Sequence, residues 1–261
     1  MPRYVGLSAS SLLNVASLAE TKGGLFKIMV ISSNISNICM DVDMDINVNM
    51  KDVCRYLGYS PDVEPSPRIA SLLGEYIETA RSLIRPAYSY IIKDIKAIVG
   101  SRAFIEGPVI FESEAIARLL ERCEKVAVFI LTVGGRLDET VRWLADSEQI
   151  IEAYVLDAIG SSVAEGLANS VEGRIQEAAR AQGLCISRRF CPGYCDWDIS
   201  QQEMVFSTIN IEYTGVFLTD EYLMLPEKSM SGIIGIGSCD SDIESYSPCA
   251  TCDKRGCPGR R

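Results

Sequence analysis

The 261-residue chain contains no histidine. Histidine is the usual base in Ser–His and Cys–His catalysis and a common zinc ligand, so these arrangements are excluded. No apolar stretch reaches the roughly 18 residues needed to span a membrane. Basic residues are also comparatively few, because 25 Lys and Arg stand against 35 Asp and Glu and give a formal charge of −10. An acidic chain lacks the basic face that nucleic acids and anionic membranes bind, so we expect neither partner.

Cysteine, in contrast, is plentiful and unevenly distributed. The chain has ten cysteines, of which six follow residue 190 and three lie in the last thirteen residues. A secreted domain stapled by disulfides is usually shorter, with its cysteines spread more evenly. We therefore expect reduced thiols and a cytoplasmic location, with the C-terminal cysteines used for a metal or a redox role.

Several stretches have the periodicity of strands or helices. Residues 41–50, "DVDMDINVNM", alternate apolar and polar side chains, which predicts a half-buried strand. Residues 125–135, "KVAVFILTVGG", are typical of a buried strand. Residues 136–179 are predicted to form helix in two pieces, and the later piece has an apolar stripe at three- and four-residue spacing. Ser66-Pro67 and Ser113 predict helix starts, through about Ile84 and Leu120 respectively.

Strands and helices are mixed without regular alternation, which predicts an α+β fold with a largely antiparallel, twisted sheet and packed helices. Further strands are predicted at 87–99, 103–113, 184–190, 216–226 and 231–237, with a short helix at 51–59 ended by Gly58 and another at 200–213. We divide the chain into a leader (1–38), a main domain (39–238) and a cysteine-rich tail (239–261).

Residues 188–197, "RRFCPGYCDW", place two arginines, two cysteines and two aromatic side chains around a Pro-Gly turn. From the residues alone, Arg189 is a surface charge at a strand end, and Tyr194 and Trp197 cover the turn. Glu165 lies off the apolar stripe of its helix, which indicates a solvated side chain. The pattern by itself assigns none of them a function.

Four blocks together give the turn a context. They are "VCRYLGY", "VAVFILTVGGRLDE" with "LDAIGSSVAEGLAN", "RRFCPGYCDWDISQQEMVFSTI" and "GVFLTDEYLMLPEKSMSGIIGIG". In this order they resemble the reactivation (activation) domain of cobalamin-dependent methionine synthase, and in particular the short free-standing proteins built on its core. The resemblance covers about residues 50–237 and implies the fold of that domain.

The resemblance also implies a function. Such domains bind S-adenosylmethionine and present its methyl group to a corrinoid whose cobalt has been oxidised to Co(II), with one electron from a donor such as ferredoxin or flavodoxin. A corrinoid-binding Asp-x-His-x-x-Gly motif is impossible without histidine, so a partner, a corrinoid-binding methyltransferase or corrinoid protein, must supply the corrinoid. The sulfonium is already an activated methyl donor, so the protein has mainly to position it and exclude water.

The family's ligand contacts can be carried over to matching positions. Its turn arginine, which can hold the ligand carboxylate, falls on Arg189. Its helical glutamate falls on Glu165 of "AEGLAN", where it could accept hydrogen bonds from ligand hydroxyl or amino groups. The remaining expected contacts are main-chain groups of the turn and a distal tyrosine that matches only with an insertion: Cys191, Gly193, Tyr194 and Tyr246. The N-terminal aspartate of the longer enzyme has no counterpart, and Cys191 replaces a small residue.

The tail contains Cys249-x-x-Cys252-x4-Cys257-Pro, with Cys239 upstream. Thiolates at this spacing predict an iron–sulfur cluster or, less favoured, a zinc site, while free thiols or a disulfide are the alternatives. An iron–sulfur cluster would suit a reaction that consumes an electron. Two other functions stay open: an electron-transfer or metal-binding module serving a corrinoid protein, and a methyltransferase acting on a small molecule.

Overall fold

The structure is a computed structural model that describes residues 36–40, 48–212 and 214–248. Its main sheet has seven strands in the order β4-β3-β2-β5-β9-β6, with β1 paired to the first half of β2. Every strand pair is antiparallel, which confirms the predicted α+β fold. The strands are β1 (Ser36–Met40), β2 (Ala87–Val99), β3 (Arg102–Ile105), β4 (Val109–Glu112), β5 (Lys125–Thr132), β6 (Leu184–Phe190) and β9 (Ser229–Ser238).

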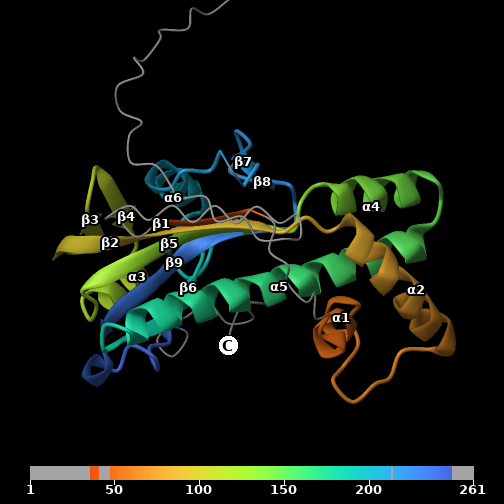
Figure 1. The fold of residues 1–261 in the computed structure, drawn as a ribbon, viewed down its shortest axis with the longest axis horizontal. Helices are drawn as coiled ribbons and strands as arrows, with labels where there is room; N and C mark the ends of the chain where they lie inside the picture. Colours follow the sequence, from red (N-terminus) through yellow and green to blue (C-terminus); the bar gives the residue numbers. More distant parts are fainter. Residues whose placement is uncertain (1–35, 41–47, 213, 249–261) are drawn as a thin grey trace, which may run out of the picture.

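Helices lie on both faces of this sheet. The long α5 runs along one face with α1, α2 and α4 packed against it, and α6 lies on the opposite side together with the small β7–β8 hairpin (Figure 1). The elements are α1 (Met50–Tyr56), α2 (Pro67–Leu83), α3 (Glu114–Leu120), α4 (Arg136–Asp146), α5 (Ile150–Arg180), α6 (Gln202–Thr208), β7 (Phe217–Leu218) and β8 (Met224–Leu225).

The central strand β5 shows why both faces need cover. Its side chains alternate between two hydrophobic cores, as the period of two in a strand requires. Ala127, Phe129 and Leu131 contribute to the core under α5, and Val126, Val128 and Ile130 to the core under α3 and α6. All six residues are buried. None of the described helices combines the length and the apolar composition needed to cross a membrane.

The predicted helix starts are confirmed. Ser66 Oγ accepts a hydrogen bond from the N–H of Ile69, with Pro67 in the first turn of α2. Ser113 Oγ accepts from the N–H of Ile116 and caps α3. Gly58 follows α1 with a φ of 82°, a conformation that glycine adopts without strain and that ends the helix as predicted. The two-piece helix at 136–179 corresponds to α4 and α5.

Other predictions were wrong in their details. The strand predicted at 41–50 is not supported at its end, because Asn49 accepts from the N–H of Lys51 and starts α1; residues 41–47 lie outside the described residues. The single strand predicted at 103–113 is the hairpin β3–β4, which turns at Gly107 with a φ of 97°. The strand predicted at 216–226 is the short β7–β8 hairpin, and α6 covers only part of 200–213. Residues 36–38, placed in the leader, belong to β1.

A disulfide replaces two of the thiols expected to be reduced. Cys185 in β6 is bonded to Cys239, which follows β9, with a Cα–Cα distance of 4.9 Å. The two strands are adjacent, and Cys185 pairs with Gly237 two residues before Cys239, so the register brings the cysteines together. The prediction of Cys239 as a metal ligand is contradicted here, because a sulfur in a disulfide is not an available thiolate.

A close approach between β9 and the end of β6 yields a prediction about stability. A Cβ atom added at Gly232 would lie 2.3 Å from the carbonyl oxygen of Phe190, so Gly232→Ala must displace backbone. We expect the free energy of unfolding to fall by about 1–3 kcal/mol, the cost of overpacking. In the control Gly173→Ala in α5, where a Cβ meets no atom within 4 Å, stability should stay equal or rise by up to about 1 kcal/mol. Urea unfolding measures both, and equal effects of the two variants would contradict the prediction.

Candidate functional site

A β-bulge in β6 determines which arginine of the motif faces α5. Ile186 pairs with Ile236 and Arg189 with Ile234, so residues 187 and 188 together oppose the single residue Gly235. Strict alternation from Ile186, whose side chain is in the core under α5, would direct Arg188 to that face. The extra residue directs Arg189 there instead, as bulges commonly do beside functional sites. Ser187 Oγ accepts a hydrogen bond from the N–H of Gly235 at 2.9 Å. This backbone N–H therefore has a partner at the point where the bulge interrupts the hydrogen bonds between the strands.

The guanidinium of Arg189 is bound by three side chains of α5. Nη1 donates to Asn169 Oδ1 at 2.8 Å and to Glu172 Oε2 at 2.7 Å, and Nη2 donates to Glu165 Oε2. Residues 165, 169 and 172 follow the spacing that places side chains on one face of a helix. The structure thus brings together Glu165 and Arg189, the two charged residues predicted for the site. Asn169 and Glu172 were missed, although their spacing from Glu165 could have indicated them.

The charged members of this cluster are largely shielded from solvent, whereas Asn169 is exposed. The exposed fractions of the side chains are 11% for Arg189, 18% for Glu165 and 29% for Glu172. Burial by itself would lower the pKa of Arg189, but the charges of Glu165 and Glu172 outweigh it and raise that pKa. Arg189 therefore stays protonated, and the three ionised groups carry a net charge of −1. A guanidinium has five N–H groups, so the three hydrogen bonds to α5 leave two for a ligand.

The Pro-Gly turn that follows Arg189 is held by its own backbone. The N–H of Gly193 donates to the carbonyl of Trp197 at 2.7 Å, and the N–H of Tyr194 donates to that of Cys191 at 3.1 Å. Gly193 has a φ of 90°, which requires glycine's freedom. Cys191 is buried, whereas 45% of Tyr194 is exposed. The carbonyl oxygen of Tyr194 also accepts from the N–H of Trp197 at 2.9 Å. Main-chain contacts from these residues to a ligand would therefore use the carbonyl oxygen of Gly193 or the second lone pair of the Tyr194 carbonyl.

Asp196 fixes the turn to the other face of the sheet. Its carboxylate accepts hydrogen bonds from Ser113 Oγ at 2.8 Å and from the N–H groups of Glu114 at 2.6 Å and Ala115 at 3.2 Å, at the start of α3. Burial would raise the pKa of Asp196, but these donors stabilise the ionised form and lower it overall. The adjacent Trp197 is buried edge-on against a phenylalanine of β4. The sequence did not reveal this anchor, because its partners lie more than eighty residues away.

Tyr246, the predicted distal tyrosine, is not brought to Glu165 and Arg189. Its hydroxyl donates to the carbonyl of Ala115 at 2.9 Å, and its ring packs 6.2 Å from that of Phe190. Phe190 and Tyr246 belong to the core under α3 and α6, and Ala115 is a residue of α3, so the sheet separates Tyr246 from α5. Burial is the main cause that raises the pKa of its hydroxyl.

The metal prediction falls largely outside the described part of the chain. Cys249, Cys252 and Cys257 lie beyond residue 248, the last one described. Within residues 36–40, 48–212 and 214–248, no group of three or more potential ligands is arranged to hold a metal ion.

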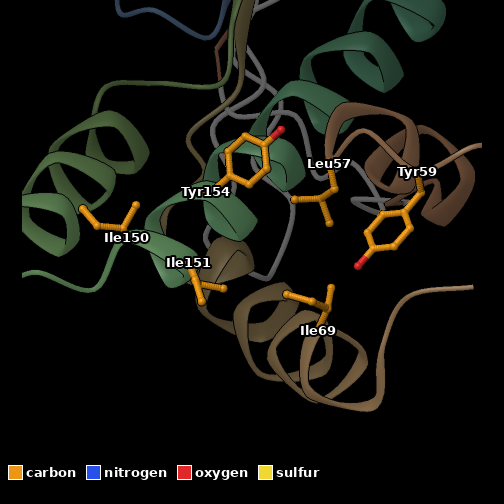
Figure 2. A pocket seen from close by; sticks show the side chains of 6 residues that line it. All are labelled: Leu57, Tyr59, Ile69, Ile150, Ile151 and Tyr154. Atoms are coloured by element: carbon orange, nitrogen blue, oxygen red, sulfur yellow. The ribbon is translucent and has the colours of Figure 1, made fainter.

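A shallow hollow of about 290 Å³ lies at the opposite end of α5 from the disulfide. Figure 2 shows its lining side chains, which come from the loop after α1, from α2 and from the first turn of α5: Leu57, Tyr59, Ile69, Ile150, Ile151 and Tyr154. Tyr154 and Glu165 are eleven residues apart on one helix, about 16 Å at the usual rise. The lining is apolar and carries none of the predicted site residues, so this hollow is distinct from the cluster around Arg189.

Comparison with known proteins supports the fold. No family model and no curated protein matches the chain. Among solved structures, the crystal structure of the MetH reactivation domain bound to AdoHcy is similar, with a TM-score of 0.59 and 14% sequence identity. The match covers 77% of this chain and 78% of that domain. At this identity the likeness establishes a shared fold, that of the MetH reactivation domain.

The Asp196 anchor predicts a pH-dependent effect on stability. Because folding lowers the pKa of Asp196, its stabilising contribution is present above the unfolded value of about 3.9 and is lost as the pH falls through the folded value. Asp196→Asn should therefore unfold more easily than wild type at pH 7, and the difference should narrow as the pH drops below about 4.

Urea unfolding at several pH values measures this difference. Asp62→Asn, at an exposed carboxylate in the loop between α1 and α2, is the control and should have little effect throughout. A difference between Asp196→Asn and wild type that stays constant with pH would contradict the role of the charge.

Proposed function

We propose that this chain binds S-adenosylmethionine at the junction of β6 and α5 and reactivates a corrinoid-dependent methyltransferase. The observation that carries the proposal is the ion pair between Glu165 and Arg189 beside the Arg-x-x-Pro-Gly-Tyr turn. The shared fold with a domain solved with AdoHcy supports it. The corrinoid comes from a partner protein. In the reaction, one electron converts Co(II) to Co(I), which takes the methyl group while the sulfonium's bonding pair returns to sulfur, leaving methyl-Co(III) and S-adenosylhomocysteine.

Each part of the site has a role in this scheme. Glu165 accepts hydrogen bonds from ligand hydroxyl or amino groups. The two remaining N–H groups of Arg189 bind the ligand carboxylate, with α5 fixing the plane of the guanidinium. The turn offers the carbonyl oxygen of Gly193 and, beside it, the exposed ring of Tyr194. Fixed side chains suit a reaction in which the protein positions an activated methyl donor and supplies no proton.

Tyr246 has no place at this site, because it lies across the sheet. The described residues contain no observation that favours the alternative of a metal-binding electron-transfer module. An iron–sulfur cluster at Cys249, Cys252 and Cys257, electron supply by ferredoxin or flavodoxin, and a cytoplasmic location stay predictions from the sequence.

Arg189→Lys tests the binding site. Arg189→Ala is unsuitable, because it would leave Glu165 and Glu172 shielded and unpaired, whereas lysine keeps the charge but loses the planar fork. Calorimetry should show S-adenosylmethionine binding weakened by about 1.5 kcal/mol or more, roughly tenfold. Arg188→Lys, in the neighbouring residue that the bulge turns away from α5, is the matched control and should bind as wild type. Equal affinities of the two variants would refute the site.

The reaction itself is tested with a Co(II) corrinoid protein as the acceptor. We expect the absorption spectrum to change to that of methyl-Co(III) only when the chain, S-adenosylmethionine and a strong reductant are all present. Arg189→Lys should slow this change at subsaturating S-adenosylmethionine, and Arg188→Lys should not. Methyl transfer to a small acceptor without any corrinoid would instead support the small-molecule methyltransferase.

A further inference from the structure

The cluster around Arg189 contains one more negative than positive charge. Glu165 alone would neutralise Arg189, and Glu172 adds the excess. We propose that Glu172 makes this site selective for a cationic ligand, so that it binds the sulfonium of S-adenosylmethionine in preference to the neutral thioether of S-adenosylhomocysteine. This inference rests on the proposed function and names a specificity-determining residue within it.

The hydrogen-bond pattern separates the charge of Glu172 from a purely structural role. Glu172 and Asn169 both accept from Nη1 of Arg189, at 2.7 and 2.8 Å. Asn169 is a neutral acceptor and already orients that nitrogen, while Glu165 orients Nη2. What Glu172 adds beyond a second acceptor is therefore its negative charge.

Among the described residues, the neighbouring cations Arg174 and Arg188 form no salt bridge with Glu172. Arg174, two residues further along α5, lies over the ring of Tyr88 at 5.7 Å. Arg188 is exposed on β6, because the bulge directs Arg189, and not Arg188, toward α5. The described residues thus place a local net charge of −1 at Glu165, Glu172 and Arg189.

The size of the effect follows from Coulomb's law. Two unit charges about 6 Å apart attract by enough to change an affinity about threefold at the dielectric constant of water, and about tenfold at half that value. The three side chains are shielded, which weakens screening by solvent. Added salt should still reduce the preference, because the ligand enters from water.

The test compares three ligands by calorimetry at low salt: S-adenosylmethionine, sinefungin (in which an ammonium group replaces the methylsulfonium) and S-adenosylhomocysteine. Wild type should bind both cations about three- to tenfold more tightly than the thioether. Glu172→Gln keeps the shape and an acceptor oxygen but removes the charge, so this ratio should fall toward one, mainly through weaker binding of the cations. Glu177→Gln makes the same charge change at an exposed position of α5 and should keep the wild-type ratio.

The outcomes separate this inference from the function on which it depends. If wild type binds none of the three ligands, the proposed function fails. If it binds all three equally, or if Glu172→Gln keeps the preference, the selectivity assigned to Glu172 is wrong while the proposed function stands. Should Glu172→Gln not fold, the wild-type ratio measured between 50 and about 500 mM NaCl decides the matter, because an electrostatic preference must shrink as salt rises. A constant ratio would overturn the inference.

Discussion

Burial of the sheet on both faces is the constraint on which the rest of the structure depends. The alternating side chains of β5 fill one core under α5 and another under α3 and α6. A charged side chain that enters either layer must find partners within the protein, because an unpaired buried charge is costly. Arg189 enters the layer under α5 at an edge strand and meets two carboxylates and one amide there. The shielded cluster and its net charge follow from that requirement.

The same constraint explains the composition of the stretch at 188–197. Its successive side chains point to opposite faces of the sheet: Arg189 is directed to α5, while Phe190 packs in the opposite layer with Tyr246. The chain then crosses the end of the sheet through the Pro-Gly turn, and Asp196 and Trp197 attach it to α3 and β4. The turn is therefore held by Arg189 on one face of the sheet and by Asp196 and Trp197 on the other. The exposed Tyr194 lies between these residues in the sequence.

Local signals in the sequence were sufficient where a single residue determines the backbone. Ser66, Ser113 and Gly58 set helix ends through bonds or dihedral angles within a few residues, and these predictions were confirmed. The pairing of Glu165 with Arg189 could be anticipated only through the resemblance to a known family. Asp196 and the Cys185–Cys239 disulfide were missed, because each depends on register or on contacts between distant segments. The position of Tyr246 was misjudged as well, since sequence spacing does not show on which side of a sheet a side chain lies.

The bulge at residues 187 and 188 has a consequence for comparing sequences. It divides β6 into two segments, one containing Cys185 and the other beginning the Arg-x-x-Pro-Gly-Tyr motif. Side chains alternate regularly between the two faces within each segment, but the bulge shifts the alternation from one segment to the next. Loss of one residue there would restore a regular ladder and leave Arg189 opposite Ile234, facing the same helix. A homologous strand can thus be one residue shorter with an unchanged site. An ungapped alignment anchored on Ile186 would then match that homologue's functional arginine to Arg188, and a gap at the bulge would restore the correct equivalence.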